Sequence, residues 1–313
     1  MNAPKIRIAT RASSLALWQA NHVADLLRAA ASGREVELVT VTTTGDQVTG
    51  KRLTEFGGVG VFTREVQQAV LDGRADLAVH SLKDLPTETV AGLTLGAVPE
   101  RAAVYDVIVL PPGRAGNASL DTLPKEARIG TGSLRRRAQL LFHRPDLCML
   151  DIRGNLDTRL KKLAAGEFDA IVLAEAGLTR LNLRDWIAGT LAPPVVYPAV
   201  GQGALGIECR DDDAVTRALL EQITHADAFA EVKAERRLLA DLRAGCHAPV
   251  GVATSIDGTA LSLEAVVLNT TGTERIVAQA VGSTDQAEAV GSAVATELRK
   301  LGAERLMGPS SGN

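Results

Sequence analysis

Two short stretches of the sequence each occur twice, and this recurrence constrains the fold more than any other feature. Arg7-Ile-Ala-Thr10 resembles Arg128-Ile-Gly-Thr131, and Gly73-Arg-Ala-Asp76-Leu-Ala-Val79 resembles Gly166-Glu-Phe-Asp169-Ala-Ile-Val172. The first stretch of each copy begins a strand, polar loop and helix pattern, and the second follows a helical pattern and precedes a polar turn. The recurrence predicts two related α/β lobes; the alternative is a chance match between short stretches.

The carboxy-terminal third has a different pattern. Its Asp257-Gly258 pair is a strong hairpin signal between two strand-like runs. A third strand follows, and helical patterns flank the group. The expected strands are Gly251–Ile256, Ala260–Leu268 and Arg275–Val281. We therefore predict a smaller α+β third domain with a three-stranded antiparallel sheet.

The composition excludes several classes of protein. With 313 residues, 46% of them hydrophobic and 23% charged, the chain is long enough for two or three globular domains. Its net charge of −3 argues against general nucleic-acid binding. It has no apolar run near the roughly 20 residues of a membrane span, and no apolar secretory segment at the amino terminus. The three cysteines form neither a disulfide framework nor a metal motif. We expect a cytoplasmic monomer without a metal.

The motif His80-Ser81-Leu82-Lys83-Asp84 is the first candidate site. It follows an apolar run that we interpret as a buried strand, and it precedes Pro86, which disfavours helix at the residue before it. Ser81, Lys83 and Asp84 would thus lie at the carboxyl end of a strand, where open α/β sheets bind ligands. The alternative is an ordinary solvated pair of charges.

Residues 128 to 162 contain nine basic residues and only three acidic ones, Asp146, Asp151 and Asp157, in a chain that is acidic overall. The basic residues are Arg128, Arg135, Arg136, Arg137, Arg144, Arg153, Arg159, Lys161 and Lys162. Such a local positive field favours a small polyanionic ligand. The alternative is a solvated basic face.

Gly130-Thr131-Gly132-Ser133 lies between a predicted strand and a predicted helix, so its amides and hydroxyls could form an anion site. Arg135 and Arg136 follow in the first helical turn, where the helix dipole disfavours cations. Their presence there suggests that they bind carboxylates or phosphates. Arg11 with Ser13, and Arg153-Gly154-Asn155, repeat this pattern after other predicted strands.

Cys246 lies in a loop after Gly245 and beside His247. A thiolate in this setting could be a nucleophile or an attachment point, although most cysteines are small buried apolar residues. We apply the buried interpretation to Cys148 and Cys209.

Six motifs, in order along the chain, resemble the porphobilinogen deaminase (hydroxymethylbilane synthase) family. They are Arg7-Ile-Ala-Thr-Arg11-Ala-Ser13 with Leu15-Ala-Leu-Trp18-Gln19, His80-Ser81-Leu-Lys83-Asp84, Gly130-Thr131-Gly-Ser133-Leu-Arg135-Arg136-Arg, Arg153-Gly154-Asn155, Pro198-Ala-Val-Gly-Gln202-Gly203 and Gly245-Cys246. The resemblance runs from Arg7 to about Val250 and is weaker beyond.

The resemblance implies two lobes like those of periplasmic binding proteins and a third domain. The implied boundaries are 1–101 with 203–221 for the first α/β lobe, 102–202 for the second and 222–313 for the α+β domain. It also implies a dipyrromethane cofactor, tethered by a thioether to Cys246. Four porphobilinogen molecules would add head-to-tail to this primer with loss of ammonia, and the product hydroxymethylbilane, a precursor of haem and other tetrapyrroles, would be released by water.

The resemblance also implies roles for the residues of this chain that match the family's motifs. Asp84 would be the catalytic carboxylate: it would assist deamination and stabilise the methylene-pyrrole cation, because positive charge that develops on a pyrrole needs a fixed negative partner. The residues expected to contact the cofactor, besides Cys246, are Ser81, Lys83, Asp84, Thr131, Ser133, Arg135 and Arg136. The residues expected to contact the substrate or growing chain are Arg11, Ser13, Phe62, Arg153, Arg159, Arg180 and Gln202. The acetate and propionate groups of each pyrrole would account for the arginine surplus.

The chain departs from the family pattern at Glu55 and Val59, where lysines are usual, at Gly132, where a second serine is common, and at Glu175, where small or apolar residues are usual. Two other functions compete with the enzyme. A non-enzymatic anion-binding protein would explain the arginines but leave Cys246 without a role. A cysteine hydrolase would need the adjacent Cys246 and His247 to form a nucleophile–base pair, which neighbours rarely do.

Overall fold

The computed structural model describes residues 5–31, 33–43, 60–113, 118–244 and 248–307. The chain divides into two compact units, Met1–Ala102 with Ala204–Phe229, and Ala103–Gly203 with Ala230–Asn313. The loop around Glu55 and Val59, and the tether position Cys246, lie outside the described residues.

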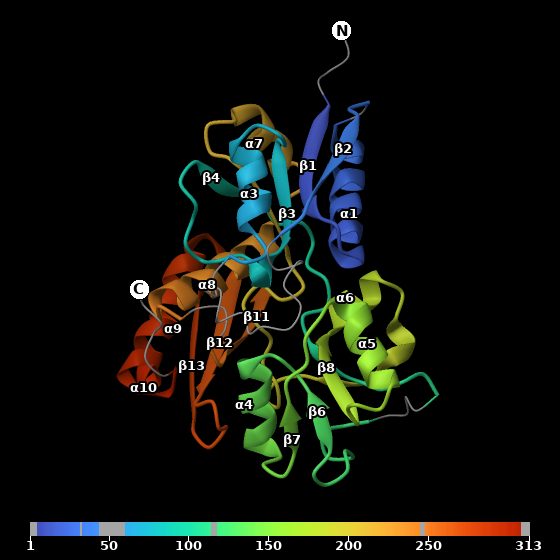
Figure 1. The fold of residues 1–313 in the computed structure, drawn as a ribbon. Coiled ribbons are helices and arrows are strands. Elements are labelled where there is room, and N and C mark those ends of the chain that lie inside the picture. The colour runs from blue at the N-terminus through green and yellow to red at the C-terminus, as the bar shows by residue number, and fades with distance from the viewer. Residues whose placement is uncertain (1–4, 32, 44–59, 114–117, 245–247, 308–313) are drawn as a thin grey trace. The chain divides into compact units, whose positions relative to one another are not determined.

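The first unit is built on a five-stranded mixed sheet (Figure 1). Its strands, in sheet order, are β2 (Val36–Val41), β1 (Ile6–Arg11), β3 (Leu77–Ser81), β10 (Leu205–Arg210) and β4 (Leu93–Ala97). Strand β1 is parallel to β2 and β3, whereas β10 is antiparallel to β3 and β4. Its helices are α1 (Ser14–Ala30), α3 (Arg64–Leu71), α7 (Ala214–Glu221) and the 3-10 turn η2 (Leu82–Asp84).

Helices cover both faces of this sheet. On one face Ile8 and Ile207 pack with Leu27 of α1 and Leu220 of α7. On the other face Ala9 and Ala78 pack with residues of α3. Since helices cover both faces and strand residues alternate between the faces, successive residues of a central strand must all be apolar. The near-continuous apolar run of β3 meets this requirement. The polar loops are thereby left at the strand ends.

The second unit contains a sheet of the same kind. Its strands, in sheet order, are β7 (Cys148–Leu150), β6 (Arg128–Gly130), β8 (Ala170–Ala174), β5 (Asp106–Val109) and β9 (Ile187–Leu191). Strands β6, β7 and β8 are parallel, and β5 is antiparallel to β8 and β9. Its helices are α4 (Leu134–His143), α5 (Leu156–Ala164), α6 (Glu175–Arg180) and the 3-10 turn η3 (Arg184–Trp186). Leu140 of α4 packs on one face, and Leu160 of α5 with Leu178 of α6 on the other.

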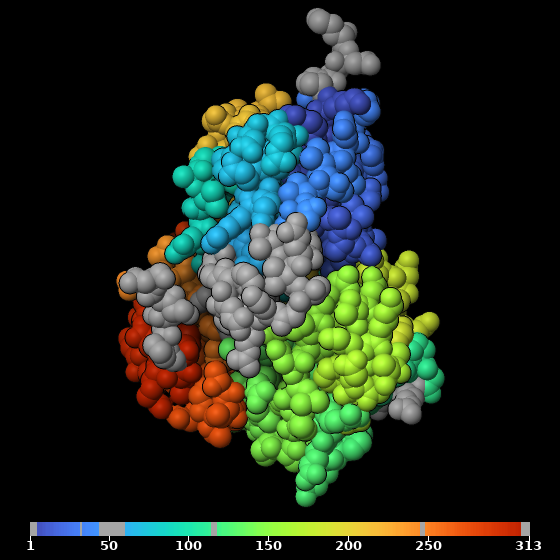
Figure 2. Space-filling model, in the orientation of Figure 1, coloured from blue at the N-terminus to red at the C-terminus, as the bar shows by residue number. Residues whose placement is uncertain are grey.

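The same unit contains the predicted three-stranded antiparallel sheet, in the order β11 (Val250–Asp257), β12 (Ala260–Leu268) and β13 (Arg275–Ser283). The associated helices are α8 (Ala226–Asp241), η4 (Thr284–Gln286), α9 (Ala287–Lys300) and α10 (Ala303–Met307). One face of the sheet packs against Leu238 of α8 and Leu298 of α9. Helices α9 and α10 form the red outer surface in Figure 2. The other face contacts Ala138 of α4 through Val266 and Leu268.

The recurrence seen in the sequence corresponds to a repeated contact. The backbone N–H of Arg7 donates to Asp76 Oδ2 at 2.7 Å, and its side chain binds both carboxylate oxygens of Asp76 and the Gly73 carbonyl. Arg128 makes the same set of contacts with Asp169 and the Gly166 carbonyl, with its N–H 2.7 Å from Asp169 Oδ2. In each unit this arginine clamp joins the first strand of the repeat to the turn before the third. The α/β fold class and the antiparallel third sheet are confirmed.

Candidate active site

The loop between β6 and α4 has the geometry of a helix start. Ser133 is the N-cap of α4, and its Oγ accepts a hydrogen bond from the backbone N–H of Arg136 at 3.4 Å. Thr131 is buried, and its Oγ1 accepts from the Ser133 N–H at 3.2 Å. The hydroxyls of the predicted cofactor residues Thr131 and Ser133 therefore stabilise the loop that precedes Arg135 and Arg136.

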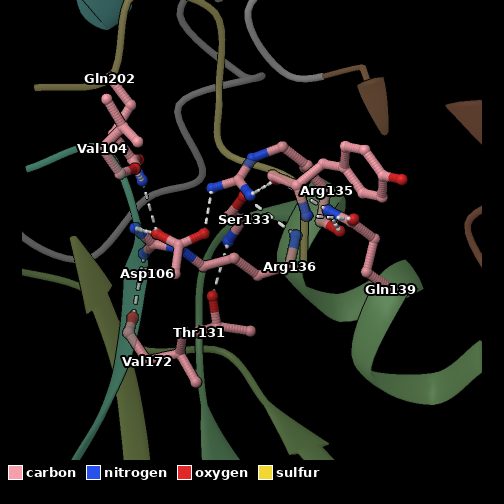
Figure 3. Close-up of polar contacts among 10 residues, drawn as sticks. Val104, Asp106, Thr131, Ser133, Arg135, Arg136, Gln139, Val172 and Gln202 are labelled. Atoms are coloured by element: carbon pink, nitrogen blue, oxygen red, sulfur yellow. Dashed lines mark hydrogen bonds and ion pairs between the residues drawn. The ribbon is translucent and has the colours of Figure 1, made fainter. Parts of the chain in front are cut away.

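Arg135 and Arg136 are both buried and both bind one internal carboxylate, Asp106 (Figure 3). Arg135 Nη2 lies 2.7 Å from Asp106 Oδ2, and Arg136 donates to Oδ1 through Nη2 at 2.7 Å and Nε at 3.0 Å. Arg135 Nη1 also donates to the Tyr197 carbonyl, and Arg136 Nη1 to the Val172 carbonyl at 2.9 Å. The side chains that were predicted to hold cofactor carboxylates thus already share a carboxylate of the protein.

Burial and charge oppose each other at Asp106. Its complete burial would raise the pKa of the carboxyl, but the two guanidinium groups outweigh this and hold the pKa of Asp106 well below its usual range. Burial lowers the pKa of Arg135, and the nearby Asp106 opposes that shift. Within the part of the chain that the structure describes, two guanidinium groups face one carboxylate, so one positive charge is uncompensated, which favours an additional anion.

Gln202 and Arg180 extend this cluster. Gln202, predicted to contact substrate, is buried and donates through Nε2 to Asp106 Oδ1 at 2.9 Å and to the Val104 carbonyl at 2.7 Å. Arg180 on α6 is buried, and its Nη2 donates to the Gly203 carbonyl at 2.8 Å. Burial lowers the pKa of Arg180 to about 10. The structure records no ion pair between Arg180 and the described side chain of Glu175, so the departure at Glu175 has no structural explanation.

Arg153 and Arg159 flank the start of α5 and are more exposed than Arg135, Arg136 and Arg180. Arg153 follows β7, and its Nη2 and Nε lie 3.0 and 3.1 Å from Asp151 Oδ2. Arg159 on α5 donates through Nε to the Gly154 carbonyl at 2.8 Å. Asn155 between them caps α5 by accepting from the Thr158 N–H at 2.9 Å. The Arg153-Gly154-Asn155 motif therefore forms the turn that starts α5.

The first unit contains the remaining predicted residues. Arg11, at the end of β1, places its guanidinium carbon 4.3 Å from the ring centroid of Phe62, a cation–π contact between two predicted substrate residues. Ser13 is the N-cap of α1, accepting from the Ala16 N–H at 3.4 Å. Ser81 Oγ accepts from Gln19 Nε2 at 2.8 Å.

Lys83 and Asp84 lie in η2, directly after β3. The turn is closed by backbone hydrogen bonds from Leu82 N–H to the Ala204 carbonyl at 3.1 Å and from Leu85 N–H to the Leu82 carbonyl at 3.0 Å. Asp84 is exposed, and within the described ranges it has no ion pair. Unlike Asp106, this carboxylate is available to a ligand.

Sequence reasoning missed two buried polar groups. Asp106 begins the apolar strand β5, and a charged residue at the start of a buried run is the signal that could have indicated an ion pair. In the first unit, Glu208 on β10 lies 3.1 Å from His80 Nε2 and accepts from Gln67 Nε2 at 2.9 Å.

The expectation that Cys148 is buried was wrong: it lies exposed at the start of the edge strand β7, whereas Cys209 is buried.

Comparison with protein families identifies the chain. Residues 6–218 match the family described as "Porphobilinogen deaminase, dipyromethane cofactor binding domain", and residues 229–300 match "Porphobilinogen deaminase, C-terminal domain". The chain belongs to the porphobilinogen deaminase family. Its cofactor is dipyrromethane, which in this family is attached covalently to a cysteine, here Cys246.

The described residues fit this cofactor. Dipyrromethane carries acetate and propionate groups, and the Arg135, Arg136 and Asp106 cluster retains a net positive charge beside the hydroxyls of Thr131 and Ser133. Guanidinium groups and hydroxyls are suitable donors for carboxylates. Among the described residues, no group of His, Cys, Asp and Glu side chains could hold a metal ion. In the same part of the chain, no helix is both long and apolar enough to cross a membrane.

Solved structures similar to this porphobilinogen deaminase family member include two periplasmic domains and a periplasmic binding protein. The periplasmic domain of Bordetella pertussis BvgS is 15% identical with a TM-score of 0.41, and the match covers 73% of this chain but only 42% of that chain. The BvgS VFT2 domain alone is 15% identical, with 73% and 92% covered and a TM-score of 0.42. A Salmonella typhimurium periplasmic binding protein with high arginine specificity is 11% identical, with 71% and 92% covered and a TM-score of 0.40.

Proposed function

We propose that the chain is a hydroxymethylbilane synthase, a transferase that deaminates four porphobilinogen molecules and joins them head-to-tail on its covalently bound dipyrromethane, then releases hydroxymethylbilane for tetrapyrrole and haem synthesis. The observation that carries this proposal is the pair of family matches, in order, over residues 6–218 and 229–300. We propose further that the enzyme is a cytoplasmic monomer of three domains, bounded as predicted from the sequence.

Asp84 is the proposed catalytic residue. Each addition joins the methylene carbon of porphobilinogen to the free α-carbon of the acceptor pyrrole: the carbon–nitrogen bond to the amino group breaks, the α-carbon loses its proton, and ammonia leaves. Positive charge therefore develops on the substrate pyrrole as the carbon–nitrogen bond breaks. A fixed carboxylate stabilises such charge better than water does, because its orientation needs no rearrangement during the reaction. The exposed position of Asp84 after β3, on a turn closed by backbone hydrogen bonds, supports this role.

The cationic residues are proposed to bind the carboxylates. Arg135 and Arg136, with Lys83, Thr131, Ser133 and Ser81, would hold the cofactor, which when bound supplies the pyrrole end to which the substrate units are joined. The proposed substrate-binding residues are Arg11, Ser13, Phe62, Arg153, Arg159, Arg180 and Gln202. In the first unit, the contact of Arg11 with Phe62 places a charge beside an aromatic face, which suits a ring that bears carboxylates.

Intact-mass measurement of the purified protein tests the proposal. The wild-type chain should carry the added mass of a dipyrrole, and Cys246→Ser should have the bare mass. Cys148→Ser is the matched control, because it removes an exposed thiol and should keep the added mass. A non-enzymatic anion-binding protein or a cysteine hydrolase would have the bare chain mass in all three samples, and that result would refute the proposed function.

A further inference from the structure

The loops after β6 and β7 lie side by side, at the carboxyl ends of two paired parallel strands. Gly130 pairs with Leu150, and the Thr131 N–H donates to the Leu150 carbonyl at 2.9 Å. A Cβ atom at Gly132 would lie 3.1 Å from the Ile152 carbonyl oxygen. The segment that contains Asp151 and Arg153 therefore lies directly against the segment that leads into α4.

Asp151 is positioned by both loops. Its Oδ2 accepts from Nε and Nη2 of Arg153 at 3.1 and 3.0 Å. A Cβ at Gly132 would lie 3.3 Å from Asp151 Oδ1, closer than most such contacts. The absence of a side chain at Gly132 thus leaves room for the Asp151 carboxylate to bind Arg153.

We propose that Asp151 is a positioning residue that tunes substrate affinity: it is the resting counter-ion of Arg153, which a substrate carboxylate must displace. The inference rests on the proposed function, in which Arg153 binds a porphobilinogen carboxylate. Asp151 occupies the Nε and Nη2 edge of the guanidinium, the edge that suits bidentate contact with a carboxylate.

The solvent exposure of Arg153 and Asp151 supports the replacement of Asp151 by a substrate carboxylate. The side chains of Arg153 and Asp151 are 38% and 51% exposed, so water can solvate Asp151 once it is displaced. Asp106, by contrast, is fully buried between Arg135 and Arg136 and cannot leave without exposing buried charges. Asp106 is thus a permanent counter-ion, whereas Asp151 is a displaceable one.

Steady-state kinetics of Asp151→Asn test the proposal. Removing the competing carboxylate should lower KM for porphobilinogen about two- to fivefold, the range expected for an exposed ion pair, and leave kcat unchanged. The shift should shrink at high salt. Glu167→Gln is the matched control. Glu167 is exposed and precedes β8, so it lies at the opposite end of the parallel strands. The KM of this variant should equal that of wild type. An unchanged or higher KM for Asp151→Asn would overturn the proposal.

Two further variants show whether Asp151 acts through Arg153. Gly132→Ala should push Asp151 away from Arg153, lower KM in the same direction, and add nothing when combined with Asp151→Asn. In an Arg153→Ala background, Asp151→Asn should no longer change KM. If Asp151→Asn still lowered KM by the same factor in the Arg153→Ala protein, Asp151 would act through long-range repulsion of the substrate and not through Arg153. The proposal would then be wrong.

A binding measurement separates this inference from the proposed function. The Arg153 Nε–Hε NMR signal, assigned by its loss in Arg153→Lys, can be followed while glutarate is added to the cofactor-loaded protein. Half-saturation should occur at about two- to fivefold less glutarate in Asp151→Asn than in wild type. Equal values would refute the role of Asp151. Failure of wild type to convert porphobilinogen would refute the proposed function, while this titration would still decide the role of Asp151.

Discussion

At the scale of single residues, two aspartates of the chain have opposite environments. Asp106 is buried and bound by two arginines and Gln202, whereas Asp84 is exposed on a short turn. A buried carboxylate of this kind stabilises the charges around it, because an arginine without a partner in a dry interior is costly. An exposed carboxylate keeps its capacity to bind a ligand. These environments lead to different expectations for the two residues.

Asp106→Asn should lower the free energy of unfolding by about 3–5 kcal/mol at neutral pH, because it leaves Arg135 and Arg136 without their counter-charge. The pKa of Asp106 is below its ordinary value of 3.8 in the folded protein, so the folded state binds fewer protons than the unfolded state. The stabilisation by Asp106 is thus present above pH 3.8 and is lost as the pH falls further. Urea unfolding at pH 6, 5, 4 and 3 should show the difference between wild type and variant shrinking below about pH 4. A difference independent of pH would contradict this assignment.

Asp84→Asn should reduce porphobilinogen turnover by about 100-fold or more, because the variant keeps the shape of the side chain but loses its charge. The dipyrrole mass and the urea midpoint should stay at the wild-type values, since Asp84 is exposed. Glu88→Gln, which makes the same charge change at an exposed residue four positions later, should retain full turnover. Turnover of Asp84→Asn within twofold of wild type would exclude the catalytic role.

At the scale of elements, the second unit depends on the docking of a hairpin against a helix. The turn between β12 and β13 includes Gly272, and a Cβ there would clash with the Ala138 carbonyl oxygen of α4. Nearby, Tyr197 donates its hydroxyl hydrogen to Glu264 of β12 at 3.0 Å, while its backbone N–H donates to Gln139 of α4 at 2.7 Å. The helix that carries the two buried arginines is therefore supported by the antiparallel sheet.

Gly272→Ala should be more destabilising than Gly258→Ala, although both glycines lie in hairpin turns with positive φ, +71° and +58°. The left-handed backbone alone should cost about 1–2 kcal/mol at each position. Gly258 has open space around its Cβ position, whereas Gly272 faces a backbone carbonyl that must move. Urea unfolding of the two variants should show the larger loss for Gly272→Ala. Equal losses would mean that the hairpin does not dock tightly on α4.

At the scale of the whole molecule, folding and cofactor binding should be linked. A group that binds only the folded state stabilises it, and the cofactor's carboxylates would compensate the net positive charge of the arginine cluster. Residues 6–218 match the family's cofactor-binding domain, and the cysteine that carries the cofactor, Cys246, lies within residues 229–300, which match its C-terminal domain. The cofactor should thus contribute to the stability of the chain as well as to its activity.

The cofactor-free Cys246→Ser protein should unfold several degrees below the loaded wild type, because each kcal/mol of lost stabilisation lowers the midpoint by about 2–4 °C in domains of this size. Scanning calorimetry of both proteins provides the measurement. Cys148→Ser, which keeps the cofactor, should unfold at the wild-type temperature. Identical midpoints for loaded and cofactor-free protein would show that the carboxylates add no stabilisation.

The sequence alone determined the α/β fold class, the antiparallel third sheet and the position of the candidate loops along the chain. The Arg7 and Arg128 stretches predicted the two repeated units, because a strand, loop and helix pattern is set by local periodicity and capping residues such as Ser13 and Ser133. The Asp257-Gly258 turn predicted the hairpin, since its backbone conformation depends on those two residues. The motifs also indicated the family, because each is a short local stretch of sequence.

Only the tertiary structure decided which charges meet. Asp106 reaches Arg135 and Arg136 from a strand about 30 residues earlier in the chain, and Glu208 reaches Gln67 across 141 residues. No local pattern encodes such pairs, because ion pairing depends on distance and burial, which arise when separate elements pack together. Periodicity could therefore place each arginine on its helix, but the packing of the sheet determined which of them bind an internal carboxylate.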